Sequence, residues 1–175
     1  RIFPENRKTN RESYSYLLSD KLNAGENNIY AILCDSKGRM WIGTFGNGLL
    51  LCEWRNGRMH SRRFSEISKT EQQIRCLTED SSGKIWAGGE NGLVIFDPDS
   101  LLTDESAFDW YFFDKNNHLS LNNNIIKAIY EDSRNQIWLG TSGGGLNLAI
   151  KDAVSGRYKF KHFTTENGLS DNIIQ

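Results

Sequence analysis

The sequence has few of the residues that build metal centres or disulfide frameworks, and it lacks long apolar runs. Its 175 residues include three cysteines, three histidines and two prolines. Cys34, Cys52 and Cys76 form no C-x-x-C pair, and the histidines lie far apart; neither pattern is typical of a metal site. No apolar segment approaches the roughly 20 residues of a membrane helix. We therefore predict no metal, no cofactor and no membrane segment in this chain.

An excess of charge of one sign is also lacking. Lys and Arg number 21 against 22 Asp and Glu, which gives a formal net charge of −1. The basic residues are scattered among acidic ones, so the chain lacks the electrostatic footprint that binding to nucleic acid requires. The first residues do not have the basic and then apolar pattern of a secretion signal. We expect either a cytosolic protein or a targeting segment outside this chain.

What the sequence does contain is one pattern that occurs three times. When three tryptophans are aligned, an aspartate stands six residues before each and a glycine two residues after it. The tryptophans are separated by 86 − 41 = 45 and 138 − 86 = 52 residues, close to the roughly 40–50-residue period of propeller blades. We interpret the repeated positions as structural: Asp35, Trp41, Gly43, Asp80, Trp86, Gly88, Asp132, Trp138 and Gly140.

Each copy predicts four short strands separated by turns. In the first copy these strands cover 29–34, 40–44, 49–52 and 62–64, and no copy has a period of 3.6 residues long enough for a helix. One four-stranded sheet cannot bury two apolar faces, so the sheets must stack. We predict an all-β fold of β-propeller blades with four antiparallel strands each. A closed ring needs about 4–8 blades, so we expect an incomplete arc of about three.

The repeat also divides the chain. We predict a connection and the tail of a preceding blade over 1–28, with a short strand at 14–17. Blades follow over 29–73, 74–125 and 126–171, and a further blade starts at 172–175, because Ile174 matches Ile126 in the pattern. The remaining blades of a longer parent chain are then the expected partners of this segment.

The pattern resembles the two-component regulator propeller repeat. The resemblance rests on Ile-x-x-Ile-x-x-Asp-x-x-Gly-x-x-Trp-Ile-Gly-Thr followed by Gly-Gly-Leu, which is matched at 29–50, 74–96 and 126–148. The segment 167–172, Asn-Gly-Leu-Ser-Asp-Asn, is similar to the family's entry to the next blade. Departures are Ala87 and Gly89 in the second copy and Asn135 in the third.

This resemblance implies a function. It points to the extracytoplasmic, periplasmic sensor region of an inner-membrane hybrid two-component histidine kinase, of a kind typical of gut Bacteroidetes. Such sensors detect oligosaccharides released from polysaccharides, act as homodimers and relay the signal to cytoplasmic kinase and receiver parts. The segment itself would carry no catalytic residue. Two alternatives stay open at this point: a carbohydrate-active propeller enzyme and a cytosolic interaction scaffold like the WD-repeat proteins.

The aspartates of the repeat are the obvious candidates for chemistry. Because each stands in the same turn of its own blade, Asp35, Asp80 and Asp132 would lie too far apart for a glycosidase pair, which needs roughly 5–10 Å. Neighbouring carboxylates in a strand, as in Glu79-Asp80 and Glu131-Asp132, point to opposite faces. We interpret the aspartates as turn caps rather than as catalytic or calcium-binding groups.

A second column of residues is the candidate ligand site. One position after the leading isoleucine of each repeat stand Tyr30, Arg75 and Lys127, and Gln175 follows Ile174 in the same way. These are hydrogen-bonding or cationic groups in otherwise apolar strands. If the first strand is innermost, they face the central channel, where they could hold sugar hydroxyls or carboxylates. The alternative is that a channel is simply lined with polar groups.

Overall fold

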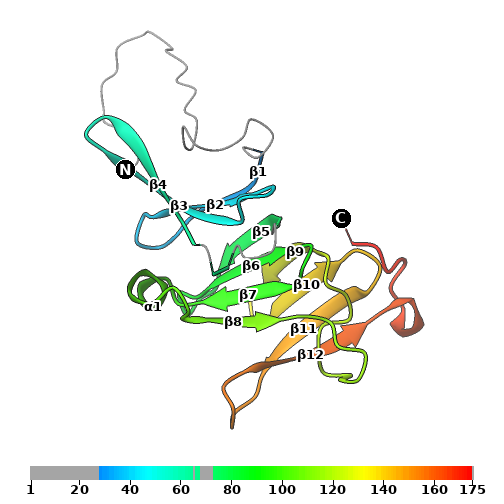
Figure 1. The fold of residues 1–175 in the computed structure, drawn as a ribbon. Coiled ribbons are helices and arrows are strands. Elements are labelled where there is room, and N and C mark those ends of the chain that lie inside the picture. Colours follow the sequence, from blue (N-terminus) through cyan, green and yellow to red (C-terminus); the bar gives the residue numbers. More distant parts are fainter. Residues whose placement is uncertain (1–27, 65, 68–72, 175) are drawn as a thin grey trace.

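Three four-stranded antiparallel sheets make up the described part of the chain. The computed structural model describes residues 28–64, 66–67 and 73–174, so the strand predicted at 14–17 and nearly all of 1–28 lie outside the described residues. We call the sheets blades 1, 2 and 3 in chain order (Figure 1). This confirms the predicted all-β propeller-like architecture.

The strand order within each blade follows the sequence. Blade 1 contains β1 (Ile29–Cys34), β2 (Met40–Thr44), β3 (Leu49–Arg55) and β4 (Arg58–Arg63). Blade 2 contains β5 (Ile74–Glu79), β6 (Ile85–Gly89), β7 (Leu93–Phe96) and β8 (Phe108–Tyr111). Blade 3 contains β9 (Ile126–Glu131), β10 (Ile137–Thr141), β11 (Gly145–Lys151) and β12 (Tyr158–Phe163).

The first strands of the three blades lie side by side. β5 contacts β1 on one side and β9 on the other, and the fourth strands lie away from this line (Figure 1). The first strand is therefore the inner one, as in a propeller. This arrangement brings the residues at the start of β1, β5 and β9 to one inner edge.

Most of the hydrophobic core lies between the blades. Between blades 1 and 2 the core contains Trp41, Leu49 and Phe64 of the first sheet and Ile85 and Phe96 of the second. The equivalent layer between blades 2 and 3 is built around Trp86, which is fully buried and whose ring lies 4.7 Å from that of Tyr158. A smaller cluster of Ile42, Leu50 and Cys52 is buried on the other face of blade 1.

A glycine on each second strand gives room to the leading isoleucine of the next repeat. A Cβ on Gly43 would lie 2.7 Å from Cγ2 of Ile74, and one on Gly88 would lie 2.7 Å from Cγ2 of Ile126. A Cβ on Gly140 would lie 2.5 Å from Cγ2 of Ile174. The repeated glycine therefore sets how closely adjacent blades approach.

Two local features differ from the expectation. β3 and β4 form a longer hairpin than predicted, because the turn with Asn56 and Gly57 in the left-handed region is flanked by paired strands. In blade 2, α1 (Pro98–Thr103) interrupts the excursion between β7 and β8. Asp97 accepts a hydrogen bond from the backbone N–H of Ser100 at 2.8 Å, and Pro98 occupies the first turn. These are the start signals of a helix.

Replacing Gly88 with alanine tests the close approach of blades 2 and 3. Without a steric conflict, Gly88→Ala would raise stability slightly by restricting the unfolded chain. Because the new Cβ meets Ile126 and the Cys76 sulfur at 2.7 Å, we expect a loss of about 1–3 kcal/mol in the free energy of unfolding. Urea denaturation measures this loss. A variant as stable as the parent would contradict the packing described above.

Candidate functional site

The aspartate carboxylate of each repeat accepts hydrogen bonds from the backbone of its own turn and from the tryptophan of the same blade. In blade 1 one carboxylate oxygen of Asp35 accepts the backbone N–H groups of Lys37 and Arg39 at 3.0 and 2.9 Å. The other oxygen accepts the indole N–H of Trp41 at 2.9 Å. Asp80 and Asp132 repeat the arrangement, with indole distances of 2.7 and 3.0 Å. These carboxylates are occupied by intramolecular donors.

The electrostatics of these aspartates follow from the same contacts. Burial acts to raise the pKa of Asp35, but hydrogen bonds from Trp41 and Arg39 outweigh it and hold that pKa below the ordinary value of 3.8. For Asp132 the hydrogen bond from Trp138 is the main cause of a lowered pKa. A carboxylate with a lowered pKa stays ionised at neutral pH and is a poor general acid.

The glutamate beside the aspartate has a different task. Glu79 of blade 2 accepts the backbone N–H and the hydroxyl of Ser36 in blade 1, at 2.7 and 2.6 Å. Glu131 of blade 3 accepts the same two groups of Ser81 in blade 2, at 2.8 and 2.6 Å. The adjacent carboxylates therefore serve two turns in two blades and do not form an acid/base pair.

The candidate ligand column coincides with a β-bulge in every blade. Tyr30 is the extra residue between the pairs Ile29↔Thr44 and Ala31↔Gly43. Arg75 and Lys127 occupy the same position in β5 and β9, between the equivalent pairs. A bulge leaves one residue outside the regular pairing and redirects its side chain. The structure thus places all three candidates at one equivalent point on the inner strands.

Two members of this column contact each other and the residues around them. The guanidinium of Arg75 lies over the ring of Tyr30, 4.8 Å from its centroid. It donates to Gln73 at 2.8 Å and forms an ion pair with Glu90. The Tyr30 ring meets Phe45 edge-on at 6.0 Å. Arg75 is therefore tied into a local network, although its buried Nε atom has no hydrogen-bond partner.

Lys127 differs from the other two. Phe45 and Glu90, the partners of Tyr30 and Arg75, each stand four residues after the tryptophan of their blade, and in blade 3 this position is Ser142. Within residues 28–64, 66–67 and 73–174, no hydrogen bond or ion pair holds the Lys127 ammonium. Lys127 is consequently the member of the column whose charge is most available to an external group.

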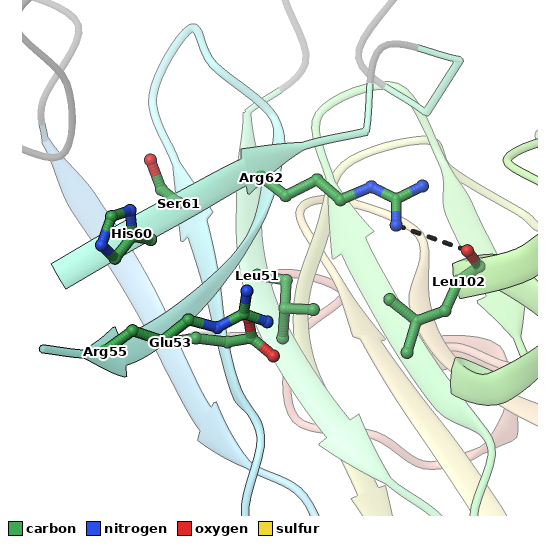
Figure 2. A pocket seen from close by; sticks show the side chains of 7 residues that line it. All are labelled: Leu51, Glu53, Arg55, His60, Ser61, Arg62 and Leu102. Atoms are coloured by element: carbon green, nitrogen blue, oxygen red, sulfur yellow. Dashed lines mark hydrogen bonds and ion pairs between the residues drawn. The ribbon is translucent and has the colours of Figure 1, made fainter.

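A separate open groove lies on the outer side of blade 1. It has a volume of about 410 Å³ and runs between the β3–β4 hairpin and Leu102 of α1 (Figure 2). Arg62 donates to the carbonyl oxygen of Leu102 at 3.3 Å and to Glu105 at 2.9 Å, and Arg55 pairs with Glu53. The charged groups in this groove thus connect the two blades or neutralise one another. We therefore interpret the groove as a contact between blades 1 and 2 and not as a binding site.

Two of the cysteines have thiols with a raised pKa. Burial raises the pKa of Cys52 to about 11. It raises that of Cys76 to about 12, against a smaller opposing effect of a hydrogen bond to Gly88. Thiols of this kind are unreactive. Among the described residues, no three His, Cys, Asp or Glu side chains cluster so as to hold a metal ion. No helix in that part of the chain is long and apolar enough to cross a membrane.

These features define an arc of propeller blades, each of which contains one hydrogen bond from the repeat tryptophan to the repeat aspartate, called here the Asp–Trp clamp. The family model described as two component regulator propeller matches the chain three times, at residues 24–46, 68–91 and 120–143. The three segments are therefore two component regulator propeller repeats, and each contributes the two inner strands of one blade.

The chain is similar to parts of two larger solved structures. The chain is 29% identical, with a TM-score of 0.55, to the extracellular domain of the hybrid two-component system BT3049 from B. thetaiotaomicron, over 73% of this chain and 15% of that one. For BT4673 of the same organism the identity is 27% and the TM-score 0.59, over 78% and 17%. The chain thus spans about a sixth of these structures.

A further neighbour shares the fold alone. Virginiamycin B lyase from Staphylococcus aureus is 18% identical with a TM-score of 0.51, over 78% of this chain and 41% of the lyase. A search of the curated proteins gave no match. The propeller architecture is therefore common to proteins of different activity, and the family model supplies the more specific information.

The pH dependence of stability tests the role of Asp35. Because its pKa is lowered on folding, the stabilisation is complete above about pH 4 and is lost as the pH falls through the folded-state pKa. We expect Asp35→Asn to lose about 1.5–3 kcal/mol at neutral pH, the range for hydrogen bonds to a charged group. We also expect the variant to respond less to acidification below pH 4 than the parent does.

Urea denaturation at a series of pH values measures both effects. Glu166→Gln is the matched control, since Glu166 is exposed and its side chain makes no hydrogen bond or ion pair with any described residue. Equal stability of Asp35→Asn and the control at neutral pH would show that the clamp contributes nothing.

Proposed function

We propose that this chain is part of the extracytoplasmic sensor region of a hybrid two-component receptor. The observation that carries the proposal is the match of all three blades to the two component regulator propeller model, together with 27–29% identity to extracellular domains of hybrid two-component systems. The segment would lie in the periplasm, and its parent would be an inner-membrane protein that relays a signal to a cytoplasmic histidine kinase.

The geometry supports a binding role over a chemical one. The three repeated aspartates each accept an indole N–H and two backbone N–H groups, and the two paired glutamates cap the turns of the preceding blades. No described carboxylate of the repeat is left to act as an acid or base. The polar groups that differ between the copies lie instead at the inner bulges, which favours recognition there.

The ligand class that we propose is an oligosaccharide released from a polysaccharide. The inner edge offers an aromatic ring at Tyr30, 42% exposed, and the ammonium of Lys127. An aromatic face packs against the apolar face of a sugar ring, while cations and hydroxyls bind its polar edge. Binding that changes the packing of blades, or of two copies in a homodimer, would carry the signal towards the membrane.

Calorimetric titration of the complete extracytoplasmic region with a panel of oligosaccharides tests this proposal. We expect one member of the panel to bind. Lys127→Ala should weaken that binding by about tenfold, as expected for the loss of one charged contact of roughly 1.4 kcal/mol.

Lys151→Ala is the matched control, because Lys151 is exposed at the outer end of β11 in the same blade. Absence of binding across the whole panel would remove the sugar-sensing proposal. Binding that Lys127→Ala and Lys151→Ala leave equally unchanged would instead place the ligand elsewhere on the receptor.

A further inference from the structure

The two blade interfaces are built from the same three contacts. A glycine of the earlier blade receives the leading isoleucine of the later one, as Gly43 receives Ile74. A tryptophan of the earlier blade is fully buried against the later one, as Trp41 is against Phe96 at 5.3 Å. A serine that follows the clamp aspartate donates twice to a glutamate of the later blade.

Blade 3 carries the earlier half of this interface in full. Gly140 already receives Ile174. The carbonyl oxygen of Asn172 accepts the N–H of Gly145 at 2.7 Å, just as that of Asn124 accepts the N–H of Gly92 at 2.8 Å. The chain from 172 to 174 therefore enters a next blade along the path that 124–126 takes into blade 3.

The face of blade 3 that points away from blade 2 is more exposed than the equivalent faces of blades 1 and 2, which the next blade covers. Trp138 is half-buried, whereas Trp41 and Trp86 have no exposed surface. Leu146 and Leu148 are half-buried, whereas the equivalent pairs in blades 1 and 2 are buried. Tyr130 is 65% exposed. Ser133, the equivalent of Ser36 and Ser81, is exposed, and no acceptor for it lies within the described residues.

We propose that this face of blade 3 binds a further blade of the same protein, and that this blade presents a carboxylate to Ser133. The register fixes where the carboxylate stands. Glu79 follows Ile74 by 79 − 74 = 5 residues, and Glu131 follows Ile126 by 131 − 126 = 5 residues. The group that binds Ser133 is accordingly an aspartate or glutamate five residues after Ile174 in the parent chain.

The chemistry of the turn explains this choice. The backbone N–H and the hydroxyl of the serine are adjacent donors, and a carboxylate offers two oxygens that accept both at once. Cys34 occupies the glutamate position in blade 1, so a first strand of this kind does not itself require a carboxylate there.

A disulfide cross-link in the parent protein tests the partner and the register together. In a Cys34→Ser background, Ser133→Cys is combined with a cysteine at the fifth residue after Ile174. We expect rapid formation of a disulfide within one molecule. Val154→Cys, on an exposed turn at the same edge of blade 3, replaces Ser133→Cys in the control and should remain reduced.

Two results would overturn the proposal. Cross-linked dimers in place of internally linked monomers would show that a second copy covers the face. A residue other than aspartate or glutamate at the fifth position would refute the carboxylate.

Thermal unfolding of the parent gives a second readout that does not depend on engineered cysteines. Ser133→Ala should lower the Tm as much as Ser81→Ala does, because each variant loses one hydroxyl hydrogen bond to a carboxylate. Val154→Ala is the control and should leave the Tm unchanged. If Ser133→Ala matched Val154→Ala while Ser81→Ala lowered the Tm, the proposed carboxylate contact would not exist.

Discussion

The hydrogen bond from a tryptophan indole to an aspartate is the interaction on which the rest of the structure depends. Stacked sheets need a large apolar group between them, and Trp41 and Trp86 provide it with no exposed surface. An indole N–H buried without an acceptor would cost about 1–3 kcal/mol. Asp35 and Asp80 remove that cost and also close the turn six residues earlier in the sequence. One side chain therefore connects the local hairpin to the packing of blades.

The contacts between blades determine what is left for function. Isoleucine on glycine, tryptophan against an aromatic ring, and glutamate on serine recur at both interfaces. Residues with these tasks cannot vary without loss of packing. The copies differ at the bulge positions, which carry the aromatic ring of Tyr30, the guanidinium of Arg75 that contacts it, and the ammonium of Lys127. In a repeat protein, positions of this kind can differ between copies while the packing residues stay the same.

Much of the fold was predictable because the repeat states it three times. The spacing of Trp41, Trp86 and Trp138 predicted the number of blades, and alternating apolar segments predicted most strands. The helix α1 was missed, although Asp97-Pro98 is a helix start signal, because a six-residue helix is too short to show a period of 3.6 residues. Departures in the second copy also have a physical reason: a Cβ at Gly89 would lie 1.8 Å from the carbonyl oxygen of Gln73.

The candidate site was predicted only in part. The sequence indicated that Tyr30, Arg75 and Lys127 share an inner position, and the structure places each at a β-bulge. Bulges depend on pairing between strands and leave no pattern in a single strand. The ion pair of Arg75 with Glu90 and the capping of Ser36 by Glu79 join residues 15 and 43 positions apart. Contacts of this kind depend on the register between strands and on the twist of the sheets. Neither can be read from a short segment of sequence. Ligand binding by the column stays a prediction.

Hydrogen exchange at the tryptophan indoles, followed by NMR after transfer to D₂O, tests the Asp–Trp clamp most directly. We expect the indole protons of Trp41 and Trp86 to exchange far more slowly in the native protein than in the urea-denatured chain. In this segment Trp138, whose clamp is half-exposed, should exchange at an intermediate rate. Exchange of Trp41 and Trp86 at the rate of the denatured chain would contradict the claim that the clamp closes each interface.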